Sequence, residues 1–275
     1  MKIESIKLGD LSVRRLGFGA MRILNSNVWG PPKDPAKAHR LLRRAVELGI
    51  DFFDTSDAYG PYTDEEAIAA ALHPYPARLV IGTKGGLLRP RPGAWDPDGR
   101  PEHLRTAVEG SLKRLRLERI DLYQLHAPDP KVKFEDSVGA LAEMQRAGKI
   151  RHLGLSNVSV KQLEQARKIA PIVSVQNRYN LGDRKSEDVL AACEKLGVAF
   201  LPWYPLGAGN SLGLSKVKEL AKKKKTSPAQ IVIAWLLARS QAMLPIPGTS
   251  SIAHLEENIA AAALELEPAE MKALA

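Results

Sequence analysis

The chain has 275 residues, 44% of them hydrophobic, and a formal net charge of +9. This length suits one large α/β domain or two ordinary ones. With a single cysteine, Cys193, no internal disulfide can form, so a reducing compartment is the simpler assumption. Residues 1–10 lack the apolar core of a signal peptide, and the longest apolar run, residues 231–238, is too short to span a bilayer. We therefore expect a cytoplasmic protein with no membrane partner.

The positive charge admits two kinds of partner, nucleic acid or small anions such as phosphorylated cofactors. The densest basic cluster, residues 222–225, contains no interleaved aromatic residue and ends a helical pattern. Lysines there favour the negative end of the helix dipole and face solvent. We expect no nucleic-acid partner.

The N-terminal part alternates short strands and helices. Two strands flank Gly9-Asp10 within residues 1–16, as in a hairpin. The apolar and helical periods then predict strands at 16–19, 50–53 and 79–84 and helices at 35–48, 64–72 and 101–117. Residues 85–100, rich in proline and glycine, are expected to form a long loop, and loops of that length are commonly functional.

The same alternation continues to the C-terminus. Strands are predicted at 120–126, 150–156, 172–176, 198–203 and 243–246, and helices at 134–145, 160–169, 185–196, 215–224, 228–238 and 251–262. No linker, composition shift or short repeat interrupts the chain. A single domain over residues 1–275 is therefore expected.

This succession of strand–helix units over roughly 250 residues favours a closed parallel (β/α)8 TIM barrel. The N-terminal β-hairpin would cap the bottom of the barrel, and extra C-terminal helices would lie outside. A doubly wound open sheet is the rival α/β architecture, but it normally carries a glycine fingerprint in its first unit. Residues 17–22 break that fingerprint at its last position, and Gly207, Gly209 and Gly213 have the wrong spacing. The barrel is the better prediction.

Polar or otherwise special residues follow the predicted strands from the second onward. They are Asp54, Tyr59, Lys84, His126, Ser156, Asn157, Gln176, Tyr204 and residues 247–249. Each has a structural explanation of its own, such as a core imidazole for His126 or a helix cap for Asn157. Because the C-terminal strand ends of a barrel meet at one mouth, their joint occurrence there favours an active site.

Four of these side chains suit the reduction of a carbonyl by a hydride from outside the protein. A phenol has a pKa near 10, and an ammonium at about 4 Å, at an effective dielectric near 20, favours the phenolate by roughly 4 kcal/mol. Lys84 is therefore expected to lower the pKa of Tyr59 and make it a proton donor near neutral pH. Asp54 would hold Lys84 charged, and His126 would orient the carbonyl oxygen.

Seven motifs follow one another in register along the chain. They are 49–55 with Tyr59-Gly60, Thr83-Lys84, 122–126, 154–157, Gln176-Asn177, 204–206, and 246–249 with Glu257-Asn258. Together, from Gly17 to Asn258, they resemble the aldo-keto reductase superfamily. The resemblance implies an NAD(P)H-dependent oxidoreductase that reduces aldehydes or ketones to alcohols by direct hydride transfer. It assigns Tyr59 as the proton donor, Lys84 and Asp54 as its tuning pair, and His126 as the carbonyl-orienting residue.

The resemblance also implies a binding site for the cofactor. Ser156, Asn157 and Gln176 would bind the nicotinamide carboxamide, Tyr204 would stack on its ring, and residues 206–211 would follow the pyrophosphate. The start of the last helix would hold the adenosine end, where backbone N–H groups favour a phosphate. The full set is Gly19, Ala20, Met21, Asp54, Ser156, Asn157, Gln176, Tyr204, Pro205, Leu206, Gly207, Pro247, Gly248, Thr249, Ser250, His254, Glu257 and Asn258.

The sequence departs from the family pattern at the adenosine end. Gly248 and His254 stand where many NADP-preferring members carry a lysine and an arginine. The excess positive charge still favours NADPH/NADP+, with NADH as the open alternative. For the substrate pocket we expect Trp29 and Trp95 beside Tyr59 and His126. Trp203 is a third candidate for an apolar lining, although core packing or mere proximity would also explain the tryptophans.

Other functions are less consistent with the sequence. Metal ligands in His-x-His or His-Glu-x-x-His spacing do not occur, so no metal is expected. Residues 154–158 lack the last glycine of the Gly-x-Ser-x-Gly pattern of serine hydrolases. The remaining alternative is an NADP(H)-binding redox-sensing or regulatory protein with slow turnover, which an aldehyde assay would distinguish. We expect a small carbonyl substrate and a monomer or weak homo-oligomer.

Overall fold

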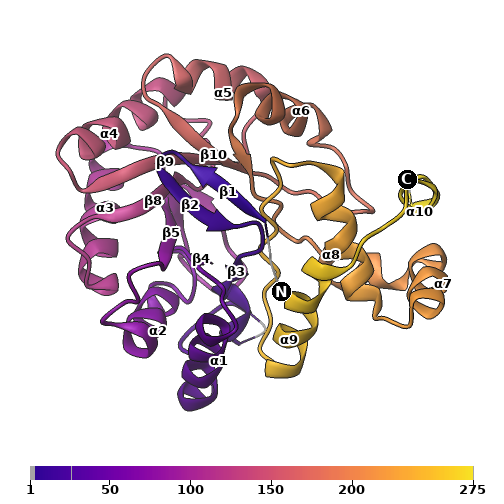
Figure 1. The fold of residues 1–275 in the computed structure, drawn as a ribbon. Helices are drawn as coiled ribbons and strands as arrows, with labels where there is room; N and C mark the ends of the chain where they lie inside the picture. The colour runs from indigo at the N-terminus through magenta and orange to yellow at the C-terminus, as the bar shows by residue number, and fades with distance from the viewer. Residues whose placement is uncertain (1–3, 26, 275) are drawn as a thin grey trace.

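The computed structural model describes residues 4–25 and 27–274, and its centre is a curled parallel sheet surrounded by helices (Figure 1). The strands pair in the order β11-β10-β9-β8-β5-β4-β3, and every pairing is parallel. Their bounds are β3 Phe18–Gly19, β4 Phe52–Asp54, β5 Val80–Gly85, β8 Ile120–Leu125, β9 Ile150–Ser156, β10 Ile172–Gln176 and β11 Ala199–Phe200. The strands are apolar because helices cover the outside and side chains fill the inside.

The barrel is closed by a segment that was predicted as a strand, residues 243–246, and that prediction is wrong in detail. Met243 forms only an isolated bridge with Phe200, and the Leu244 N–H donates to the Phe200 carbonyl at 2.9 Å. On the other side, the Gly17 N–H donates to the Pro245 carbonyl at 2.9 Å. Pro245 and Pro247 have no N–H to extend a ladder. The (β/α)8 barrel class is confirmed, with this segment in the place of the eighth strand.

The helices form the outer layer and largely follow the predicted ranges (Figure 1). They are α1 Pro35–Glu47, α2 Thr63–Leu72, α3 Pro101–Leu115, α4 Phe134–Arg146, α5 Val160–Arg167, α6 Glu187–Leu196, α7 Ser215–Lys224, α8 Pro228–Arg239, α9 Ile252–Ala260 and α10 Pro268–Leu274, with short 3-10 turns at Ala20–Ile23, Gly207–Gly213 and Ala261–Ala263. The last helix, α10, was not predicted. Among the described residues, none of these helices has the length and apolar character needed to cross a membrane.

The N-terminal hairpin, β1 Ser5–Leu8 and β2 Leu11–Arg14, covers the bottom of the barrel as predicted. Leu8 and Val13 are fully buried against barrel-interior residues such as Phe52 and Leu122. The Arg14 backbone N–H also donates to the Asp51 carboxylate at 2.9 Å, just before β4 begins. The hairpin therefore seals the N-terminal strand ends and leaves the opposite mouth as the open one.

Residues 85–100, predicted as a loop without secondary structure, contain a small antiparallel pair, β6 Leu87–Leu88 with β7 Asp96–Pro97. Between these strands the Arg89 guanidinium lies 3.7 Å from the centroid of the Trp95 ring. The Arg89 side chain is buried and donates to the backbone carbonyls of Val28 and Ala58, at 3.3 Å each. Because the Trp95 ring is partly exposed, this cation–π contact stabilises by about 1 kcal/mol and helps to hold the indole in place.

Candidate active site

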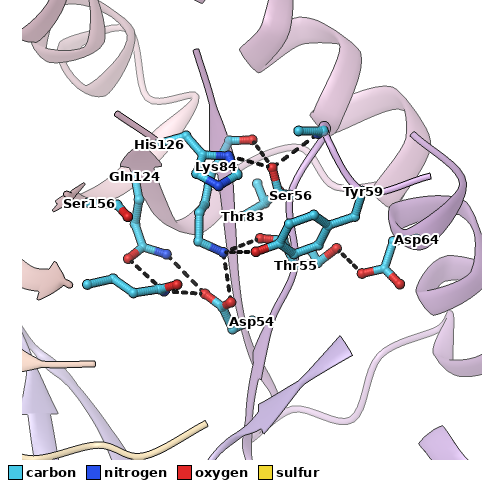
Figure 2. Close-up of polar contacts among 12 residues, drawn as sticks. Asp54, Thr55, Ser56, Tyr59, Asp64, Thr83, Lys84, Gln124, His126 and Ser156 are labelled. Carbon is cyan, nitrogen blue, oxygen red and sulfur yellow. Dashed lines mark hydrogen bonds and ion pairs between the residues drawn. The ribbon is translucent and has the colours of Figure 1, made fainter. Parts of the chain in front are cut away.

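Asp54, Lys84 and Tyr59 meet at the open mouth of the barrel (Figure 2). Lys84, on the buried strand β5, donates from Nζ to Asp54 Oδ2 at 2.7 Å, to the Thr55 carbonyl at 2.8 Å and to the Tyr59 hydroxyl at 3.3 Å. A turn places Tyr59 there, because its N–H donates to the Ser56 carbonyl. Since Lys84 supplies the hydrogen of that contact, the hydroxyl hydrogen of Tyr59 is left for a partner in the cavity.

The expected lowering of the pKa of Tyr59 is wrong for this structure. Burial raises the pKa of Tyr59 to about 12, and the attraction of Lys84 offsets only part of that effect, while Asp54 adds to it. The sequence argument used the Coulomb attraction and could not include the depth of burial. Tyr59 is therefore protonated at neutral pH and keeps its proton available for donation.

For the pKa of Lys84, the neighbouring groups outweigh the effect of burial. Burial alone would lower the pKa of the ammonium, but Asp54 and Tyr59 together raise it above its ordinary value. The ion pair is enclosed, with Lys84 and Asp54 almost inaccessible to solvent. Lys84 is thus a permanent cation at the base of the site.

Two glutamine side chains hold the second oxygen of Asp54. Gln176 Nε2 donates to Asp54 Oδ1 at 2.7 Å, and Gln124 Nε2 donates to it at 3.2 Å. Gln124 was not predicted as a site residue, although a fully buried amide in the apolar strand β8 is a recognisable signal. These bonds fix the carboxylate and, through it, the ammonium of Lys84.

His126 follows β8 directly, and its ring packs edge-on to Tyr59, with centroids 5.8 Å apart. Burial, reinforced by the positive charges of Lys84 and Arg89, lowers the pKa of His126 well below its usual range. The imidazole is therefore neutral and carries one N–H. Its Nδ1 lies 3.0 Å from the hydroxyl oxygen of Ser56.

These groups open into a cavity of about 370 Å³. Its lining includes most of the predicted residues: Gly19, Met21, Asp54, Tyr59, Trp95, His126, Ser156, Asn157, Gln176, Trp203, Tyr204, Pro205, Leu206, Pro247 and Gly248, together with Ala208 and Gly209 from the predicted segment 206–211. Arg22 and Ile246 line it in addition. The cavity runs from the reactive groups along the segment after β11 to the segment before α9. Polar side chains and apolar rings alternate in this lining, and such a mixture suits a nucleotide cofactor.

Several predicted cofactor residues lie outside that lining: Ala20, Gly207, Thr249, Ser250, His254, Glu257 and Asn258. Thr249 and Asn258 are buried, whereas Ser250 and His254 are exposed. Ser251 caps α9 by accepting from the His254 backbone N–H. Their place in cofactor binding therefore stays a prediction.

Ser156, Asn157 and Gln176, the predicted ligands of the nicotinamide carboxamide, all line the cavity. Some of their hydrogen-bonding groups already bind other protein groups. Asn157 Nδ2 donates to the His126 carbonyl at 3.0 Å and to Ser156 Oγ at 3.1 Å, and Asn157 Oδ1 accepts from Trp203 Nε1 at 3.0 Å. The hydroxyl hydrogen of Ser156 and the carbonyl oxygen of Gln176 remain for a ligand. Asn157 and Tyr204 have φ of 58° and 51°, a conformation that costs energy and is concentrated at functional sites.

Of the two tryptophans predicted in the substrate pocket, Trp95 lines the cavity and Trp29 does not. Trp95 lines the cavity, 6.3 Å from the ring of Tyr59 and 6.4 Å from that of His126. Trp29, placed by the sequence in the substrate pocket, lies instead beside Arg89, 5.6 Å from its guanidinium, and outside the cavity lining. It supports the loop that carries Trp95, because Arg89 contacts both rings.

Arg22 is a lining residue that sequence reasoning missed. Its Cγ lies 3.1 Å from the point where Gly248 would carry a Cβ, and that point is also 2.5 Å from the Gly19 carbonyl oxygen. A side chain at residue 248 therefore has no room on this backbone. The stem of Arg22 and the Gly19 carbonyl occupy the space beside residue 248, and Arg22 itself lines the cavity.

Asp64, fully buried at the start of α2, adds a pH-sensitive group beneath the site. Burial raises its pKa to about 7, despite the hydrogen bond from the Thr55 hydroxyl. The unfolded chain releases this proton near pH 4 and the folded chain near pH 7, so the free energy of unfolding falls as the pH rises between these values.

We expect Asp64→Asn to remove this loss. Its free energy of unfolding, relative to the unsubstituted protein, should be higher at pH 8 than at pH 5, by about 3 kcal/mol at most. Urea unfolding at the two pH values measures the difference. An equal effect of the substitution at both pH values would show that Asp64 does not titrate in this range.

Comparison with known proteins agrees with this geometry. The chain belongs to the aldo/keto reductase family, whose family model matches residues 15–275. Pyridoxine 4-dehydrogenase from Escherichia coli is 42% identical over 273 residues, which cover 97% of this chain and 95% of that protein. The structure of a glycerol dehydrogenase from Gluconobacter oxydans matches with a TM-score of 0.90 and 28% identity, covering 100% of this chain and 94% of that one. An aldo-keto reductase from Klebsiella pneumoniae, solved in complex with NADPH, shares the fold at a TM-score of 0.84 and 24% identity, covering 100% and 94%.

Proposed function

We propose that this protein reduces aldehyde or ketone groups to alcohols, with Tyr59 as the proton donor and a reduced nicotinamide cofactor as the hydride source. The observation that carries the proposal is the contact of Lys84 Nζ with both Asp54 and the Tyr59 hydroxyl, at 2.7 and 3.3 Å, at the base of a cavity. A protonated phenol faces that cavity, and an adjacent fixed cation stabilises the phenolate that donation leaves behind.

The donor set of the cavity fits NAD(P)H. The free hydroxyl of Ser156 and the carbonyl of Gln176 would bind the carboxamide, and Tyr204, 36% exposed, presents a ring on which a flat heterocycle can stack. When bound, the cofactor supplies the hydride. The remaining steps belong to the protein: His126 holds a carbonyl oxygen, Tyr59 gives it a proton, and Lys84 stabilises the resulting charge.

We further propose that NADPH is preferred over NADH. Arg22 is a cationic residue on the cavity lining, its stem beside Gly248, and the net charge of +9 attracts a phosphorylated ligand. The exposed side chain of His254 stands at the start of α9, where helix N–H groups favour a phosphate.

His254→Arg should strengthen this preference, because a guanidinium binds phosphate oxygens in a bidentate way. We expect the ratio of NADPH to NADH affinity to rise about tenfold, corresponding to roughly 1.4 kcal/mol. Fluorescence titration with both cofactors measures the ratio. His73→Arg, the same substitution at an exposed histidine outside the cavity lining, is the matched control for added guanidinium charge. An unchanged ratio would mean that residue 254 does not face the extra phosphate.

The relatives suggest which substrates to test. The names of the two dehydrogenases point to alcohols, pyridoxine and glycerol, so the same site in this protein would interconvert small alcohols and their carbonyl forms. The apolar edge made by Trp95 and Trp203 favours compact aromatic or short aliphatic substrates.

The proposed function is tested in two steps. The first is a titration that measures the affinity for NADPH and NADH. The second is a set of steady-state assays with aldehydes, ketones and quinones and, in the oxidative direction, with pyridoxine and glycerol. We expect saturable cofactor binding and turnover of at least one carbonyl class. Tight cofactor binding without turnover on the whole panel would contradict the enzymatic function and favour the redox-sensing alternative.

A further inference from the structure

Ser56 lies beside the imidazole of His126, and a hydrogen-bond contact joins the two side chains (Figure 2). It is fully buried, and its hydroxyl oxygen lies 3.0 Å from His126 Nδ1. Ser56 does not line the cavity itself. Its contact therefore acts on the imidazole rather than on a bound substrate.

The hydrogen-bond count around Ser56 indicates the direction of this contact. The hydroxyl oxygen already accepts from the Ala58 N–H at 3.1 Å, and its one hydrogen has three acceptors within reach. His126 Nδ1 is the nearest, since the Asp57 carboxyl and the Lys84 carbonyl are each at 3.3 Å. The Lys84 carbonyl is also served by the Asp57 backbone N–H at 3.1 Å.

Asp57 is a weak competitor for the Ser56 hydrogen. Burial, together with the nearby Glu65 carboxylate, raises the pKa of Asp57 well above its ordinary value, which favours the protonated carboxyl. A neutral carboxyl accepts hydrogen bonds less strongly than a carboxylate, and it can itself donate to the serine oxygen. The Ser56 hydrogen is thus left for the imidazole.

We propose that Ser56 is a positioning residue: by donating to Nδ1, it holds His126 in the tautomer that carries its proton on Nε2. A neutral imidazole has one N–H, and only a ring nitrogen that carries hydrogen can donate to a carbonyl oxygen. The opposite tautomer would present a lone pair to that oxygen and repel it. The inference rests on the proposed function, because it assumes that His126 orients a carbonyl.

The experiment has a spectroscopic part that does not depend on activity. In protein with isotope-labelled histidine, nitrogen NMR distinguishes the protonated from the unprotonated ring nitrogen, and His126→Asn assigns the signal. We expect Nε2–H in the unsubstituted protein and a mixture of tautomers, or Nδ1–H, in Ser56→Ala. Finding Nδ1–H in the unsubstituted protein overturns the proposal even if Ser56→Ala fails to fold.

The kinetic part separates positioning from a structural role. We expect Ser56→Ala to lower kcat for an aldehyde at least about tenfold, with NADPH affinity unchanged, because the donor to the carbonyl is lost in part of the molecules. Ser56→Thr keeps the hydroxyl and should recover most of kcat. Ser174→Ala, at another fully buried serine, is the matched control and should leave kcat unchanged.

Ser56→Ala with both Nε2–H and kcat retained would overturn the inference and leave the proposed function intact. Absence of turnover in the unsubstituted protein would instead contradict the proposed function, while the tautomer measurement would still decide the role of Ser56.

Discussion

Replacing Lys84 with methionine is expected to reduce carbonyl reduction by about 10³-fold and to destabilise the fold by about 3–5 kcal/mol. The ammonium is the only partner of Asp54 that carries charge among its described hydrogen bonds, and it also binds the Thr55 carbonyl. Without it, a buried carboxylate keeps only the two glutamine amides, and the phenolate of Tyr59 loses its neighbouring cation.

A double variant separates these two effects. In Asp54→Asn/Lys84→Met both charges are absent, so we expect stability to recover in part while activity stays low. Urea unfolding and steady-state kinetics on the three proteins give the comparison. Two results would contradict these roles of the ion pair. One is a Lys84→Met variant as stable as the unsubstituted protein, and the other is restored turnover in Asp54→Asn/Lys84→Met.

Tyr59→Phe is the second substitution with a large expected effect. It removes one oxygen, keeps the ring that packs against Trp95 and His126, and leaves the cofactor cleft unchanged. We therefore expect kcat to fall by about 10²–10⁴-fold, the usual contribution of a positioned acid. Stability should change little or rise, because a buried hydroxyl with a single long contact to Lys84 is lost.

Most of the fold could be predicted from the sequence because its strands are short apolar runs between helices of clear period. The predictions for 150–156 and 172–176 agree with β9 and β10 residue for residue. They fail at residues 198–203 and 243–246, where only Ala199–Phe200 forms a strand and the prolines at 202, 245 and 247 leave isolated bridges in place of a continuous ladder. The single-domain organisation stays a prediction.

The site was predicted because its residues follow strand ends, which the barrel brings to one mouth. What the sequence could not supply was depth of burial, and this reverses the expected direction of the pKa of Tyr59. It also could not distinguish Trp95 in the cavity from Trp29 beside Arg89. Gln124 and Ser56 were missed because their partners, Asp54 and His126, are remote in sequence.

The most direct test of the central claim, that Tyr59 donates the proton into a nicotinamide-binding cavity, is a single-turnover measurement on Tyr59→Phe loaded with NADPH. We predict cofactor affinity within about threefold of the unsubstituted protein and oxidation of the bound cofactor by an aldehyde slowed at least about 10²-fold. Tyr75→Phe, which removes a hydroxyl bonded to the Leu115 carbonyl far from the cavity, serves as the control and should react normally. Oxidation at the normal rate in Tyr59→Phe would contradict the claim.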